Sequence, residues 1–120
     1  MKTRSAKHKG KRLQATVRRA IVERFPHLAD EDVQVTIGSE PGPDIKLSPN
    51  ARRAFPYSVE CKNVERLNIW SALLQTEANT REGTAPLLVF SRNRAEPYVA
   101  IPLAEFMKLL TPGSSSGATL

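Results

Sequence analysis

Apolar residues recur at helical spacing in two long stretches of the chain. The first, residues 10–25, predicts a helix that ends before Pro26, because the residue before a proline avoids the α region. Its apolar stripe consists of Leu13, Val17, Ala20, Ile21 and Phe25. The second, residues 66–79, predicts a helix whose buried stripe is Leu67, Trp70, Leu73 or Leu74, and Ala78. The alternative for Trp70 is a stacking or dimer contact.

Strand patterns occupy much of the remaining chain. Residues 33–37 alternate apolar and polar side chains, whereas residues 87–90 form a continuous apolar run typical of a fully buried strand. Further strands are predicted at 44–47, 57–61 and 98–101, and a closing helix at 103–110. The first three strands follow one another closely and should pair antiparallel, and the helix at 66–79 is a crossover between parallel strands. The expected fold is α/β, a mixed sheet flanked by helices.

Length and composition predict one domain. A chain of 120 residues is long enough for a single core, which we place at 10–110, between a flexible basic arm at 1–9 and a disordered Pro/Gly/Ser-rich tail at 111–120. No apolar run approaches the roughly 20 residues of a membrane span, and no apolar segment follows the basic start, as a secretory signal requires. The lone cysteine, Cys61, excludes an internal disulfide and suits a reducing cytoplasm. With His8 and His27 as the only histidines, a closed zinc site is not expected.

The charge is concentrated at the N-terminus. Residues 1–22 hold eight Lys or Arg and no acid, whereas the rest of the chain holds ten basic and twelve acidic residues. A cationic arm on a near-neutral body indicates a polyanionic partner such as DNA, although a solubilising tail has the same composition. The residues expected to contact the DNA backbone are Lys7, Lys9, Lys11 and Arg12 in this region and Arg52, Arg53, Arg92 and Arg94 in loops. Solubility is the alternative role of the loop arginines.

Three residues form a candidate catalytic group. Glu60 and Lys62 lie two residues apart on a predicted strand and so project from the same face, with roughly 6.5 Å between their Cα atoms. Asp44, after a Gly/Pro loop, supplies a second carboxylate, which is enough for Mg²⁺, with Mn²⁺ as an alternative. The metal would activate a water molecule, and Lys62 would position or deprotonate that water or stabilise the transition state. Cys61 points to the opposite face as a core residue, with its backbone carbonyl as a candidate metal ligand.

These residues resemble the PD-(D/E)xK nuclease signature. Asp44 follows Pro43, and Glu60-Cys61-Lys62 follows after 15 residues. The predicted order also resembles the αβββαβ core of restriction-endonuclease-like folds. Within this superfamily, the chain is most similar to small Holliday-junction resolvases of archaea and phages, through Lys9-Gly10, Gly38-Ser39, Pro43-Asp44-Ile45 and Glu60-Cys61-Lys62-Asn63. The resemblance covers residues 9–110. It implies symmetric, Mg²⁺-dependent cutting of four-way DNA junctions by a homodimer, in DNA recombination and repair inside a bacterial or phage-infected cell.

One position departs from the resolvase pattern. Those enzymes usually carry a glutamate in the first helix as a further metal ligand, whereas this chain has Gln14. Glu23 lies about 180° round the helix from Gln14 and cannot replace it, which leaves Glu40 as a candidate. Two auxiliary residues are Ser39, which would bind a phosphate or simply form a turn, and Gln75, which would orient the lysine or lie on the surface.

Two other functions fit the same sequence. A repair, restriction-like or phage-genome nuclease without junction preference needs the same three catalytic residues. A basic DNA-binding module without catalysis is consistent with the neutral side chain of Gln14.

Overall fold

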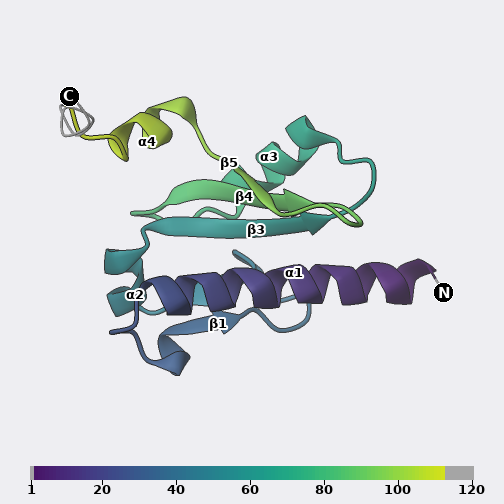
Figure 1. Cartoon of the computed structure of the whole chain (residues 1–120), viewed down its shortest axis with the longest axis horizontal. Coiled ribbons are helices and arrows are strands. Elements are labelled where there is room, and N and C mark those ends of the chain that lie inside the picture. Colours follow the sequence, from purple (N-terminus) through teal and green to yellow (C-terminus); the bar gives the residue numbers. More distant parts are fainter. Residues whose placement is uncertain (1, 113–120) are drawn as a thin grey trace.

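The chain folds as a mixed sheet between helices, which confirms the predicted α/β class (Figure 1). The computed structural model describes residues 2–112. Its elements are α1 (Lys2–Arg24), a 3-10 turn (Asp30–Asp32), β1 (Val33–Val35), β2 (Ile45–Leu47), α2 (Pro49–Ala54), β3 (Tyr57–Asn63), α3 (Ile69–Ala78), β4 (Ala85–Ser91), β5 (Tyr98–Ala100) and α4 (Leu103–Lys108). Apart from the small helix α2 and the 3-10 turn, this is the expected αβββαβ order.

The main sheet has the order β3-β4-β5. β3 and β4 are parallel, as predicted from the α3 crossover, and β4 and β5 are antiparallel. β1 and β2 form a separate antiparallel pair, so the expected meander of three paired strands is wrong at its third strand. The cause is local, because α2 occupies the connection between β2 and β3. The β1-β2 pair contacts β3 through a backbone hydrogen bond that the Asp44 N–H donates to the Val59 carbonyl at 2.8 Å.

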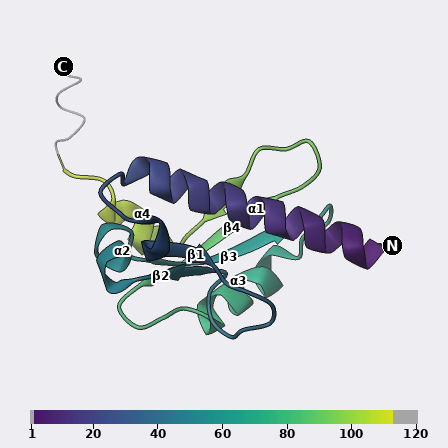
Figure 2. The ribbon, with the colours of Figure 1, turned by 90° about the horizontal axis from the view of Figure 1, so that it is seen from below.

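Each face of the main sheet is covered by a different helix (Figure 2). On one face, α1 buries Leu13, Val17 and Ile21 against Val59 and Cys61 of β3. On the other face, α3 lies over the side chains that alternate with these, including Glu60 and Leu88, which are 5% and 0% exposed. The expected division of β3 into an apolar face with Cys61 and a polar face with Glu60 is therefore confirmed.

Helix α1 begins at Lys2 and not at Gly10, so the expected helix start was wrong. Residues 2–9 contain no proline or glycine, and lysine, arginine and alanine are good helix formers. Once the stretch from residue 10 has formed a helix, each added turn costs little, because nucleation is the expensive step. The basic segment is therefore a continuation of the helix. The predicted disordered tail lies outside the described residues, except for Thr111 and Pro112.

The buried stripe of α3 also differs from the prediction. Ala72 and Thr76 face the sheet at 3% and 2% exposure, whereas Trp70 is 75% exposed. Small side chains let the helix approach the strands closely, and the hydroxyl of Thr76 donates to the Ala72 carbonyl at 2.7 Å, so its polar group is satisfied inside. The expectation that the largest apolar residues mark the buried face was wrong here.

None of the helices within residues 2–112 combines the length and apolar character needed to cross a membrane.

Candidate active site

Asp44 lies at the open edge of β3, where a neighbouring strand would otherwise pair. Its N–H donates to the Val59 carbonyl at 2.8 Å, and its Oδ2 accepts a hydrogen bond from the Cys61 N–H at 2.8 Å. The Asp44 carboxylate thus takes the place of the backbone carbonyl with which a neighbouring strand would accept this hydrogen bond. Because the N–H and C=O groups of one strand residue point to the same side, the Cys61 carbonyl is directed to this edge as well.

The loop before Asp44 fixes this approach. Gly38 and Gly42 have φ angles of 64° and 106°, which residues with a Cβ rarely adopt. The Thr36 hydroxyl donates to the Pro43 carbonyl at 2.7 Å, and the Thr36 N–H donates to the Asp44 carbonyl at 2.9 Å. The loop therefore delivers Asp44 in one orientation to the edge of β3.

Glu60 is a buried carboxylate close to Asp44. Burial is the main cause that raises the pKa of Glu60, and the negative charge of Asp44 raises it further. The Asn79 amide, which donates to Glu60 Oε1 at 3.3 Å, and the Lys62 ammonium oppose this rise. The structure therefore brings Asp44, Glu60 and Lys62 within electrostatic range of one another.

The pKa of Asp44 is also raised, again chiefly by burial. The Cys61 N–H, the Lys62 ammonium and hydrogen bonding from the Gln14 side chain act in the opposite direction. The half-buried Gln14 side chain on α1 therefore lies beside Asp44. Two raised carboxylate pKa values side by side indicate a site that gains from a bound cation.

The described residues supply no third acid at this site. Within residues 2–112 there is no group of three or more His, Cys, Asp or Glu side chains arranged to hold a metal ion. Glu40, the candidate replacement, forms an ion pair with Lys46 at 2.8 Å. The available oxygen donors are two carboxylates, the Gln14 amide and the Cys61 carbonyl, and this set fits a hard cation that keeps several water ligands, such as Mg²⁺ or Mn²⁺. The Cys61 thiol belongs to the core, where burial raises its pKa.

Part of the expected DNA-contacting set lies at the same end of the molecule as this site. The N-terminal half of α1 extends past the end of β3, and the turn between β4 and β5 lies beside it (Figure 1). Lys7, Lys11, Arg12, Arg92 and Arg94 are exposed there, and Lys9 is half-buried. The Lys9 carbonyl accepts a hydrogen bond from the Asn63 amide at 3.4 Å, which ties this half of α1 to the end of β3.

The other predicted residues are placed differently. Arg52 and Arg53 belong to α2, at the opposite end of β3 (Figure 1). Arg52 donates to the Leu47 carbonyl at 2.6 Å and so supports β2, and Arg53 bonds the Asn50 side chain at 3.3 Å. Ser39 and Gln75 are exposed. The structure does not bring these arginines to the carboxylates.

Asn79 was not predicted as a site residue. It is the C-cap of α3, and its side chain bonds Glu60. Asparagine is common where helices end, so its presence in the sequence after Ala78 indicated only a helix terminus.

Removing one negative charge should stabilise the metal-free protein. A carboxyl group whose folded pKa is raised stabilises the fold fully below its ordinary pKa, and this contribution is lost as the pH rises through the raised value. We therefore expect Asp44→Asn to melt a few degrees higher than the wild type near pH 7 without metal, with the difference vanishing near pH 4. Calorimetry across this pH range in a chelator measures it. Equal melting temperatures of the variant and the wild type at pH 7 would show that burial of the charged Asp44 carboxylate does not destabilise the fold.

The comparisons with known proteins give one match. A family model described as "Phage putative PDDEXK endonuclease" matches residues 5–115. No curated protein and no solved structure matches the chain.

Proposed function

The chain belongs to this family of phage PD-(D/E)xK endonucleases, and on that premise we propose that it is a Mg²⁺-dependent Holliday-junction resolvase that cuts branched DNA as a homodimer. The family is one of DNA-cutting hydrolases, and nucleases of this superfamily use divalent metal ions. The observation that carries the proposal is the placement of Asp44 on the Cys61 N–H, beside Glu60 and Lys62.

In the proposed hydrolysis of a phosphodiester, each residue of the site has its own role. Asp44, Glu60 and the Cys61 carbonyl would hold the metal, and Gln14 would offer a neutral oxygen. When bound, the metal lowers the pKa of a water molecule and neutralises charge on the phosphate. The Lys62 ammonium, on the same face as Glu60, orients that water or stabilises the charge that develops on the phosphate. Asn79 holds Glu60 in place through the amide contact at 3.3 Å.

The DNA-binding residues of the proposal are those that share an end with the site. Lys7, Lys9, Lys11 and Arg12 on α1, with Arg92 and Arg94 in the neighbouring turn, would contact backbone phosphates on either side of the cut. We leave Arg52 and Arg53 out, because their side chains bond other parts of the chain at the opposite end of β3. Branched DNA is proposed from the resemblance of residues 9–110 to junction resolvases. The corresponding role is processing of phage DNA in the cytoplasm of the host.

A competition assay tests the substrate. Purified protein and Mg²⁺ are given a labelled four-way junction together with a linear duplex of the same arm sequence. We expect paired, symmetric nicks in the junction and at least about tenfold slower cutting of the duplex, in line with the substrate discrimination that enzymes achieve through transition-state contacts. Equal cutting would favour a nuclease without junction preference. Salt-sensitive binding without cutting in Mg²⁺ or Mn²⁺ would favour the non-catalytic module that Gln14 suggests.

Restoring an acid on α1 should tighten metal binding. Gln14→Glu places a third negative charge beside Asp44, and affinity for a divalent ion rises with the charge of its ligands. We expect about tenfold tighter Mn²⁺ binding by calorimetric titration, and a lower melting temperature of the metal-free protein because the carboxylates repel one another.

Gln14→Leu is the matched control for this change. It removes the amide oxygen without adding charge and should weaken metal binding modestly. An unchanged affinity in both variants would place residue 14 outside the metal site.

A further inference from the structure

Helix α4 leaves its apolar side uncovered. It contains no buried residue, although Leu103, Phe106, Met107 and Leu110 follow helical spacing and form one stripe. Leu103 is 75% exposed and Phe106 47%. The charged residues of the helix, Glu105 and Lys108, pair with each other at 3.2 Å on the other side. A short amphipathic helix with this arrangement lacks a partner for its apolar stripe.

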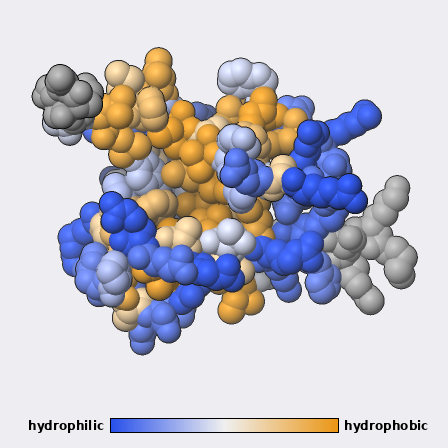
Figure 3. All heavy atoms as spheres, viewed as in Figure 1, coloured by the Kyte–Doolittle hydropathy of each residue, from blue (hydrophilic) through white to orange (hydrophobic). Residues whose placement is uncertain are grey.

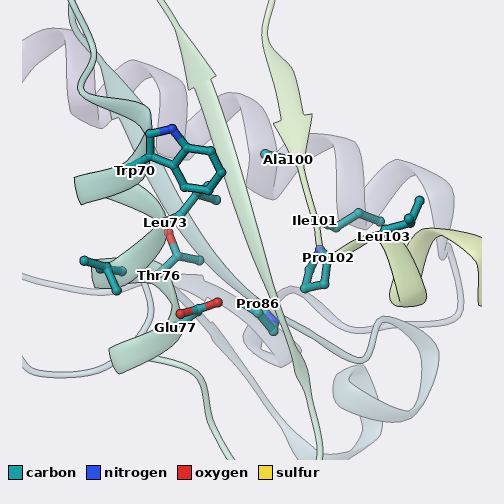
Figure 4. Close-up of a pocket in the computed structure, with 10 residues that line it drawn as sticks. Trp70, Leu73, Thr76, Glu77, Pro86, Ala100, Ile101, Pro102 and Leu103 are labelled. Atoms are coloured by element: carbon teal, nitrogen blue, oxygen red, sulfur yellow. The ribbon is translucent and has the colours of Figure 1, made fainter.

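Two apolar grooves adjoin this helix. One, of ≈ 1140 Å³, lies over the sheet between α1 and α4, with Leu87, Val89 and Val99 among its lining residues. The other, of ≈ 510 Å³, lies on the α3 side, and Trp70 and Leu74 are among its lining residues. Figure 4 shows Trp70 and Leu73 of α3 on one side of it and Ile101 and Leu103 on the other. Both include Ala100, Ile101 and Leu103, so they form one surface around the edge strand β5.

We call this the α4 surface and define it by the exposed residues Trp70, Leu74, Val99, Leu103, Phe106 and Leu109. Figure 3 shows apolar side chains gathered over β5 and α4. The six side chains are between 47% and 75% exposed and line grooves on both sides of β5, and exposed apolar surfaces of this kind mark interaction sites. The surface is therefore a candidate for a protein contact.

We propose that a second copy of this chain docks on the α4 surface around a twofold axis near Leu103. The surface is self-complementary, because it carries both a projecting apolar helix and apolar grooves of the kind that such a helix fills. Its charges agree with this arrangement. Arg24 borders the groove on the α1 side, and Glu77 borders the groove on the α3 side. In the proposed arrangement, Arg24 of each copy lies opposite Glu77 of the other.

DNA does not fit this surface. The six defining residues carry no charge, and the basic half of α1 lies at the other end of the molecule (Figure 1). Phosphate contacts come largely from charged or polar side chains, and the six apolar side chains of this surface offer none. The inference rests on the homodimer of the proposed function and is independent of cleavage.

The mass of the full chain in solution tests the surface. We expect the wild type to sediment at twice 13.3 kDa at micromolar concentration. Leu103→Glu and Phe106→Glu should each raise the dimer dissociation constant by at least about 100-fold, because buried anchors dominate interface energy. Ile37→Glu is the matched control: Ile37 is 82% exposed in the loop before Asp44, and this variant should remain dimeric. Circular dichroism confirms that each variant is folded.

A charge exchange tests the twofold arrangement. Arg24→Glu should weaken the dimer, and Arg24→Glu with Glu77→Arg should restore it. A monomeric wild type at 100 µM, a dimer that persists in both Leu103→Glu and Phe106→Glu, or an exchange that fails to restore association would overturn the inference. A dimer that cuts no DNA would refute the nuclease alone, and a monomer that cuts DNA would refute the dimer surface alone.

Discussion

Asp44→Asn and Glu60→Gln are each expected to reduce DNA cleavage by about 10³-fold or more, the scale on which single groups of a catalytic unit act. Both variants keep the size of the side chain and one carbonyl oxygen but remove a negative charge that faces the other carboxylate. The metal would then be held by one charged ligand, so its affinity falls together with the rate. Single-turnover cleavage of a labelled junction gives the rate, and calorimetric titration with Mn²⁺ gives the affinity.

The asparagine variant should preserve the fold at the edge of β3. Its side-chain oxygen can still accept the hydrogen bond from the Cys61 N–H, which in the wild type is 2.8 Å from Asp44 Oδ2. Glu40→Gln is the matched control, because Glu40 is a nearby acid that is paired with Lys46 at 2.8 Å. It should cut at close to the wild-type rate. Cleavage that survives in Asp44→Asn would contradict the assignment of the site.

The strand that carries the proposed catalytic residues was well predicted by side-chain alternation. Val59 and Cys61 lie in the core and Glu60 on the other face, as a period of two requires. The approach of Asp44 was predictable only as a turn before a strand. Its actual position depends on two tertiary hydrogen bonds to β3, which leave no trace in local sequence.

The errors have a common physical origin. Alternation and helical periodicity identify which residues share a face, but the partner element decides which face is buried. On α3, close packing on the sheet selects Ala72 and Thr76, and Trp70 is left for the surface. On α1, a helix formed by residues 10–24 extends into a basic segment whose sequence has no apolar stripe that would indicate a helix. Contacts made across the fold, such as the Asn79 amide on Glu60, were equally invisible.

Lys62→Ala should reduce cleavage by about 10²- to 10³-fold, because it removes a donor that stabilises charge in the transition state. Metal affinity should stay within a few-fold of the wild type, because the metal ligands are unchanged. The ammonium also lowers the pKa of both Asp44 and Glu60. Its removal therefore raises both pKa values further, and the acidic limb of the pH–rate profile should move to higher pH. Rates from pH 5 to pH 9 at saturating Mg²⁺ measure both effects.

The two effects separate the roles of Lys62. If the lysine acts only by keeping the carboxylates ionised, Lys62→Ala recovers the wild-type rate at high pH, where both acids are charged. If it contacts the water or the phosphate, the rate remains low at every pH, and this is the result we expect. Lys46→Ala, which removes a lysine paired with Glu40, should show neither effect. The Lys62 ammonium is the positive charge that opposes the rise in the pKa values of both Asp44 and Glu60. A wild-type rate with an unshifted pH profile in Lys62→Ala would therefore exclude Lys62 from the site.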